Sequence, residues 1–294
     1  LSPWKFSSCH SSGIWRKIEN FSTNSVFLIL CSDLYFEKDQ LRENNEYKVR
    51  NSHVFLQYEF NENTKISAEY TNMNYKLQQP GGVTDEQFNN NPRQSLRERN
   101  WFGTPWNVFS LNFDTKLSSN LSSNYKFFGL IAERNSVGFT ATPNVEDAIN
   151  TTSNTYENRR VDRDFYKNFG FENRNILTYN LGKTKNHLAF GTRLYTANTK
   201  RKQQGVGSTC SDFNLNIEGE YPRNLDFNTE NFTLFAENEF KFTDLFSVTP
   251  GIRYEYINST AEGQFGLNGN TPVYLENKKI TRNKPLVGLG LEYK

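Results

Sequence analysis

The sequence has no apolar run long enough to cross a membrane as a helix. A spanning helix needs about 20 consecutive apolar residues, and the longest candidate, residues 25–31, falls far short of that length. Hydrophobic residues make up 35 % of the chain and its mean hydropathy is −0.76, which excludes a helical membrane protein. The same values leave a membrane β-barrel open, because barrel strands place every second residue in a polar interior.

Cysteine and histidine are scarce as well. The three cysteines, Cys9, Cys31 and Cys210, form no CxxC pair and cannot all pair with one another, so their spacing predicts neither a disulfide framework nor a zinc site. The three histidines lie far apart without HExxH spacing, and neither GxSxG nor a phosphate-binding loop occurs. The sequence therefore predicts a protein that is not an enzyme and that carries no cofactor and no metal.

Neither positive nor negative charge is in large excess. The chain has 34 basic and 32 acidic residues, for a net charge of +2, so no overall field favours a nucleic-acid partner. Any electrostatic recognition must then come from local groups of charges.

Aromatic residues are abundant, at 15 % of the chain, and many of them occupy alternate positions. The clearest case is the stretch 231–258, where Phe232 and Leu234 share one parity while Thr233 and Glu237 hold the other. Such alternation indicates a strand with one apolar face. The pattern resumes after a short polar break at 243–245, so the stretch predicts a long hairpin.

Three further hairpins and one last strand follow the same pattern. The expected hairpins cover 51–70, 106–132 and 169–194, and the last strand covers 287–293. Short turns alternate with four long polar loops at 77–105, 133–168, 200–229 and 258–285. Loops longer than about 15 residues are unusual in compact domains, whereas outer-membrane barrels combine short turns at one end with long loops at the other.

The predicted fold is therefore all-β: an antiparallel transmembrane β-barrel of which about nine or ten strands are present. An open sheet edge within a bilayer leaves backbone groups unsatisfied, so these strands are expected to belong to a larger barrel. The barrel region is assigned to residues 42–294. Residues 1–41 contain no convincing hairpin and form an unassigned N-terminal segment.

Three segments resemble the β-barrel of TonB-dependent outer-membrane receptors, in particular the ferric-citrate-receptor-like branch common in Bacteroidota. They are LQQPGGVTDEQFNNNPRQSLRERNWF (77–102), FFGLIAERNSVGF (127–139) and LFAENEFKFTDLFSVTPGIRYEY (234–256). The resemblance covers most of residues 42–294.

The resemblance implies a barrel of 22 strands in the outer membrane of a Gram-negative bacterium, in contact with its lipid. In such a receptor a plug domain fills the barrel, and TonB supplies energy for the uptake of a ferric chelate such as ferric citrate or a siderophore. The sequence shows neither a plug nor a TonB-box-like segment, so it is expected to be a fragment of a longer receptor. The alternatives are a barrel remnant that no longer transports and a passive pore without a plug.

Arginines gather in the expected long loops, and four of them are candidate ligand-binding residues. These are Arg93, Arg97, Arg99 and Arg134. An anionic chelate such as ferric dicitrate presents carboxylates, which the planar guanidinium binds in bidentate fashion. The alternative is that these arginines pair with neighbouring loop carboxylates and hold the loops together.

Two further patterns bear on the loops and on the barrel interior. Thr84 and Gln87 have capping-box spacing, which predicts a short helix within the first loop. Charged residues on the second parity are expected either to line a solute path or to form a polar ladder against a plug; they are Lys65, Glu69, Asp114, Arg193, Glu237, Glu239, Arg253 and Glu255. A barrel enzyme of lipase or protease type is disfavoured, because His187 lies near a short turn, at the wrong end for a loop-level active site.

Overall fold

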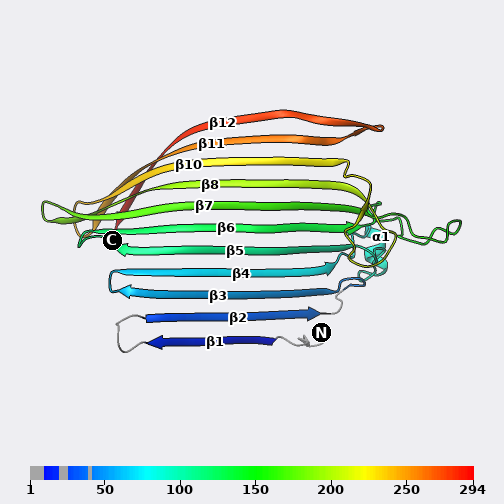
Figure 1. Ribbon diagram of the computed structural model, residues 1–294, viewed down its shortest axis with the longest axis horizontal. Helices are drawn as coiled ribbons and strands as arrows, with labels where there is room; N and C mark the ends of the chain where they lie inside the picture. The colour runs from blue at the N-terminus through cyan, green and yellow to red at the C-terminus, as the bar shows by residue number, and fades with distance from the viewer. Residues whose placement is uncertain (1–9, 20–25, 39–41) are drawn as a thin grey trace.

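The computed structural model describes residues 10–19, 26–38 and 42–294, and in the first two ranges only Tyr35 has a described side chain. These residues form one antiparallel sheet in which the strands follow chain order (Figure 1). The path runs from β1 to β8 and then through β10, β11 and β12, while β9 pairs with β8 alone. The all-β fold class is thus confirmed.

The strands lengthen from β1, with 10 residues, to β8, with 24. Their bounds are β1 His10–Glu19, β2 Val26–Lys38, β3 Tyr47–Asn61, β4 Thr64–Gln78, β5 Trp101–Lys116, β6 Leu121–Gly138, β7 Arg160–Leu181, β8 Thr184–Gly207, β9 Ile217–Glu218, β10 Arg223–Lys241, β11 Phe246–Asn268 and β12 Thr271–Tyr293. One helix, α1 (Asp85–Asn90), lies between β4 and β5. No helix in the described part of the chain has both the length and the apolar character needed to cross a membrane.

Strand pairing in register joins residues of one parity into rows across the sheet. One such row runs through Phe127, Phe171, Leu194, Phe232 and Tyr256 on β6, β7, β8, β10 and β11. All five side chains are exposed, which is the arrangement that a lipid-facing surface requires. We call the face that carries this row the outer face, and the opposite face the inner face.

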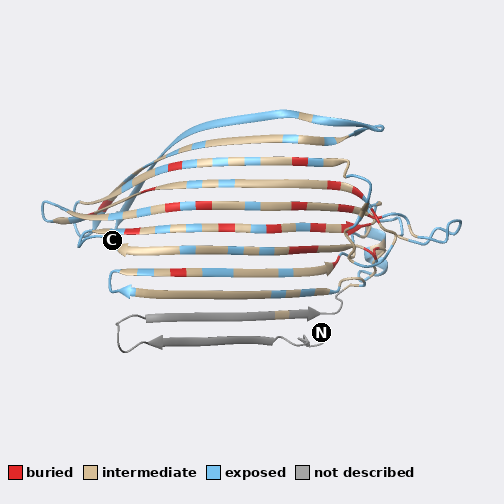
Figure 2. Cartoon of the chain, viewed as in Figure 1, coloured by how far each residue is buried: buried red, intermediate tan, exposed pale blue. Residues whose placement is uncertain are grey.

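Little of the apolar surface is enclosed by the protein. Among the described residues the buried hydrophobic side chains are Ala132, Val137, Val161 and Leu225. Figure 2 shows buried positions scattered singly along the strands and gathered at the loop end of the sheet. The inner face is polar and charged, as the alternation predicts, and the main enclosed region lies at the loop end.

The connections divide into two ends. Tight turns join β3 to β4, β5 to β6, β7 to β8 and β10 to β11 at one end, and α1 lies with the long loops at the other (Figure 1). The helix begins with the predicted capping box: the Thr84 hydroxyl accepts from the Gln87 amide at 3.2 Å, and the Gln87 side chain accepts from the Thr84 amide at 2.8 Å. This prediction is confirmed.

The prediction of a fourth long loop at 258–285 is wrong. β11 continues to Asn268 and β12 begins at Thr271, so the connection is a tight turn in which Gly269 has φ +61°. Positive φ is what a two-residue hairpin turn requires. The extended arms mix many polar residues with exposed apolar ones such as Phe265 and Val273, and two register shifts near Gly263 and Gly266 interrupt the alternation.

The N-terminal segment also differs from expectation. β1 and β2 pair antiparallel from His10–Tyr35 to Glu19–Val26, where no hairpin was expected, although residues 1–9, 20–25 and 39–41 lie outside the described residues. With these two strands and the short β9 the sheet has 12 strands instead of nine or ten.

Candidate functional site

Three long loops at one end of the sheet are joined by buried arginines. We call this assembly the loop cluster; it comprises residues 79–100, 139–159 and 208–222. Arg97, Arg99 and Arg159 lie within it with exposed fractions of 4 %, 0 % and 1 %. A guanidinium is rarely buried so completely unless its donors are satisfied, and the contacts of these arginines show how that is achieved.

Arg99 connects all three loops. Its Nε donates to Asp147 Oδ2 at 2.9 Å, and its Nη2 donates to the other carboxylate oxygen of the same residue. Its Nη1 donates to the carbonyl of Thr209 at 2.9 Å, and its Cζ lies over the ring of Tyr156, 4.1 Å from the ring centre. One side chain of the first loop therefore binds both other loops.

Arg159 reinforces the same junction from the second loop. Its Nη1 donates to the carbonyls of Arg99 at 3.0 Å and Asp212 at 2.7 Å, and its Nε donates to the carbonyl of Ser208 at 3.2 Å. Burial, and after it the positive charge of Arg99, lowers the pKa of Arg159. The backbone carbonyls around it supply the acceptors that water would otherwise provide.

Arg97 fixes the first loop against the second. Its two terminal nitrogens donate to the carbonyls of Val145 at 2.6 Å and of Ala141 and Thr142 at 2.8 Å, and Phe139 lies below its guanidinium. Arg97 and Arg99 thus donate within the loop cluster, Arg99 to a loop carboxylate and Arg97 to backbone carbonyls. Arg93 is exposed on the first loop. Ligand binding by these three residues stays a prediction.

Arg134, the fourth candidate, lies on β6 and belongs to a different group on the inner face. Its Nη1 is 3.3 Å from Asp164 Oδ2 on β7, and Arg201 Nε on β8 is 3.2 Å from Asp164 Oδ1. The Asp164 side chain is 3 % exposed, whereas those of Arg134 and Arg201 are 45 % and 43 % exposed. One buried carboxylate thus serves two half-exposed cations, which leaves net positive charge at the surface.

The sequence predicts loops at Asp164 and Arg201, and loop positions have no strand register that would join either residue to Arg134. In the structure β7 begins at Arg160 and β8 extends to Gly207, so Asp164 stands on the strand next to β6 and Arg201 on the strand after it. Ladder neighbours on one face have Cβ atoms about 5 Å apart, close enough for the observed ion pairs. The missed signal was that Asp164 and Arg201 keep the parity of the inner face.

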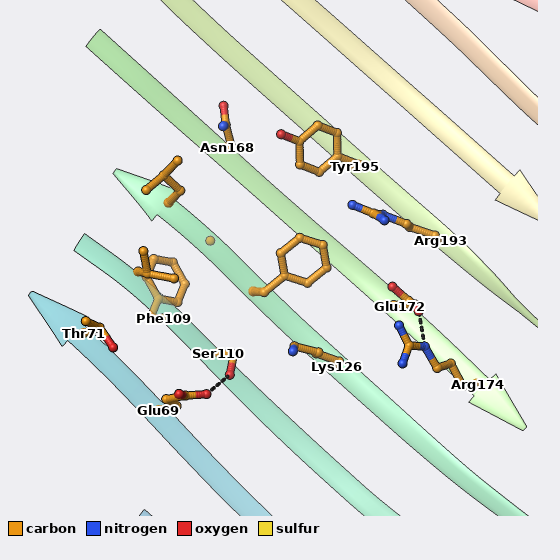
Figure 3. A pocket seen from close by; sticks show the side chains of 14 residues that line it. Glu69, Thr71, Phe109, Ser110, Lys126, Asn168, Glu172, Arg174, Arg193 and Tyr195 are labelled. Atoms are coloured by element: carbon orange, nitrogen blue, oxygen red, sulfur yellow. Dashed lines mark hydrogen bonds and ion pairs between the residues drawn. The ribbon is translucent and has the colours of Figure 1, made fainter. Parts of the chain in front are cut away.

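Farther from the loops, the inner face carries a groove of about 460 Å³, which we call the inner-wall groove (Figure 3). Its charged side chains come from β4 to β8: Glu69, Lys126, Glu172, Arg174 and Arg193. Figure 3 shows Glu172 bound to Arg174 and Glu69 bound to Ser110. Among the described residues no group of three or more His, Cys, Asp or Glu side chains could hold a metal ion.

Two family models match the sequence. The model described as TonB dependent receptor-like, beta-barrel matches residues 34–294. A second model, described as WxcM-like, C-terminal, matches residues 9–52, a short span that overlaps the first match and lies partly outside the described residues. None of the curated proteins compared with the chain matches it.

Solved structures share the fold at low sequence identity. The ferric citrate transporter FecA in its unliganded form superposes with a TM-score of 0.73 at 17 % identity, over 97 % of this chain and 42 % of its own. The ferric-catecholate import receptor Fiu from E. coli K12, in its open form, gives 0.72 at 10 % identity, over 96 % and 50 %. The copper transporter OprC gives 0.63 at 12 % identity, over 99 % and 44 %.

This chain therefore spans half or less of the length of these three structures. Identities this low support the fold and leave the cargo undecided. The family model, in contrast, covers most of the sequence, and the outward apolar rows, the polar inner face and the two unlike ends of the sheet agree with it. The chain belongs to the TonB-dependent receptor-like β-barrel family, whose members are non-enzymatic transporters of the Gram-negative outer membrane.

Proposed function

We propose that this chain forms barrel wall and external loops of a receptor that takes up an anionic ferric chelate, ferric citrate or a siderophore, by TonB-dependent transport. A plug domain and TonB are the partners that the proposal requires in the whole receptor. The observation that carries the anionic cargo is the group of Arg134, Asp164 and Arg201 just below the loop cluster. The likeness to the ferric citrate transporter FecA supports the same class of ligand.

The geometry of this group suits a carboxylate ligand. Asp164 occupies one side of each guanidinium, and close to half of each arginine side chain remains exposed on the inner face. The ring centre of Phe102 lies 5.4 Å from the Arg134 guanidinium and packs against it. Two positioned guanidinium groups, on the strands either side of β7, can bind the carboxylates of a single chelate.

The test removes both guanidinium groups in the receptor that contains this chain. Arg134→Gln with Arg201→Gln should lower the uptake of radioactive iron supplied as ferric citrate or as a carboxylate siderophore. Each hydrogen-bonded charge contact contributes about 1.5–3 kcal/mol, so the affinity of the double variant should fall at least tenfold. Lys200→Gln is the matched control, because Lys200 is next to Arg201 but lies on the outer face, 3.1 Å from Asp226.

Two results would contradict the proposal. Unchanged uptake in the double variant would remove these arginines from the binding site. A whole receptor that binds neutral or cationic chelates with higher affinity than anionic ones would overturn the cargo class, and the structural likeness to a copper transporter makes copper complexes a necessary comparison in that assay.

A further inference from the structure

We infer that the inner-wall groove is a second anion site, which binds the carboxylate of a small hydroxycarboxylate through Arg193 and Lys126. The site lies on the same face as Arg134 but farther from the loops, so it would receive the ligand after the loop-level arginines. In this respect the inference rests on the proposed function. Its evidence, however, comes from separate residues.

Arg193 is unpaired in the part of the chain that the structure describes. No hydrogen bond or ion pair to its guanidinium is present there, and its Nε is buried without an acceptor. Buried donors nearly always have a partner, and an unsatisfied one costs about 1–3 kcal/mol. An incoming carboxylate would supply the missing acceptor.

The guanidinium of Arg193 is held in place by aromatic rings. It lies 5.4 Å from the ring centres of both Phe128 and Tyr195, and these rings stack at 6.4 Å with an interplanar angle of 22°. Phe128 can lie flat because its ladder partner is Gly170, where an added Cβ would come within 2.2 Å of the ring. The cation is therefore positioned before a ligand arrives, which reduces the entropic cost of binding.

The charges around Arg193 favour an anion. Glu172 stands between Lys126 and Arg193 in the ladder, but its carboxylate binds Arg174 on its own strand. Lys126 has no ion pair with any described residue. Glu69 also lines the groove, where it accepts a hydrogen bond from Ser110 at 3.4 Å. Two carboxylates therefore accompany three cations, and the surplus positive charge faces the groove.

A second unsatisfied atom defines the ligand class more closely. Asn168 Oδ1 lines the same groove and is buried without a donor. A carboxylate satisfies Arg193, whereas only a donor such as a hydroxyl satisfies this oxygen. A small hydroxycarboxylate carries both groups, and the groove of about 460 Å³ can hold a molecule of that size.

The experiment uses phenylglyoxal, which modifies arginine side chains, on the purified receptor that contains this chain. Modification of each arginine is followed by peptide mass spectrometry with citrate as the probe and with sodium chloride at equal ionic strength as the comparison. Citrate at about ten times its Kd should slow the modification of Arg193 about tenfold by mass action. Lys126→Gln should weaken this protection, and Lys116→Gln, on the same face at the exposed end of β5, should not.

The outcomes separate this site from the loop-level site. Protection of Arg193 that depends on Lys126 supports the inference, whether or not Arg134 and Arg201 are protected. Equal rates of Arg193 modification with and without citrate would overturn it. Complete resistance of Arg193 to modification without citrate would also overturn it, because another part of the receptor would then already occupy the groove.

Discussion

Removal of the Arg99 guanidinium should separate the three loops of the loop cluster. Arg99→Met keeps a long side chain but leaves the Asp147 carboxylate, which is 1 % exposed, buried without its partner. Breaking a buried ion pair from one side costs about 3–5 kcal/mol. The carbonyl of Thr209 loses its donor as well, so the third loop is released together with the second.

Hydrogen exchange measures this change directly. The amide of Gly207 donates to the carbonyl of Arg159 at 2.7 Å, and the amide of Asp147 donates to the carbonyl of Leu96 at 3.3 Å. The first hydrogen bond joins the second loop to the end of β8 and the other joins it to the first loop, so both amides exchange when the cluster opens. A loss of about 3–5 kcal/mol corresponds to exchange that is faster by about two to three and a half orders of magnitude.

Control variants separate the ion pair from the loss of a charge. Arg93→Met removes an exposed arginine from the same loop and should leave both amides protected. Asp147→Asn added to Arg99→Met should recover part of the loss, because the buried charge is then gone. If Arg99→Met left exchange at Gly207 and Asp147 unchanged, Arg99 would not hold the loops together, and the reasoning from its burial would be refuted.

Two further predictions concern the sheet. Leu234→Arg, on the outer face of β10 where Leu234 is exposed, should impair membrane assembly of the receptor at a cost of about 2–4 kcal/mol near the midplane. Glu237→Gln on the inner face should assemble normally, and a heat-modifiability gel assay compares the two variants. Equal behaviour of the two would contradict the face assignment. Gly170→Ala should displace Phe128 and lower the free energy of unfolding by about 1–3 kcal/mol. Gly288→Ala should be neutral, because a Cβ added there meets nothing within 4 Å. The same denaturant midpoint for both variants would show that the position of Phe128 does not depend on Gly170.

The membrane-facing part of the fold was readable from the sequence because lipid and water impose a strict period of two. Residues 231–258 show it, and the structure pairs Phe232 with Tyr256 on the outer face as the parity requires. The same rule fails where both faces meet water. The arms of β11 and β12 beyond Asn258 are rich in polar residues and their alternation is broken by two register shifts, so the backbone pairing defines them as strands.

The candidate site was less predictable, for a different physical reason. Sequence shows that arginines gather in the loops, but not which carbonyls and carboxylates will lie around them. Arg99 meets Asp147 and Thr209 across separations of 48 and 110 residues, and such contacts depend on how three loops fold over one another. Arg134, in contrast, stands on a strand, so the register of β6 with β7 places Asp164 directly opposite it.

The division of the arginines between the loop cluster and the inner face has a consequence for specificity. Receptors of the same fold include transporters of ferric citrate, ferric catecholate and copper, so the backbone cannot decide the cargo. Arg99 and Arg159 use their donors on the Asp147 carboxylate and on backbone carbonyls of the loops, and these contacts fix the position of the loops. Arg134, Arg201 and Arg193 keep part of their surface or a donor unsatisfied. A ligand gains binding energy from donors that the protein itself leaves without an acceptor. Substitution of these three inner-face residues should therefore change which anion is taken up, while substitution of the buried loop arginines should affect all anions alike.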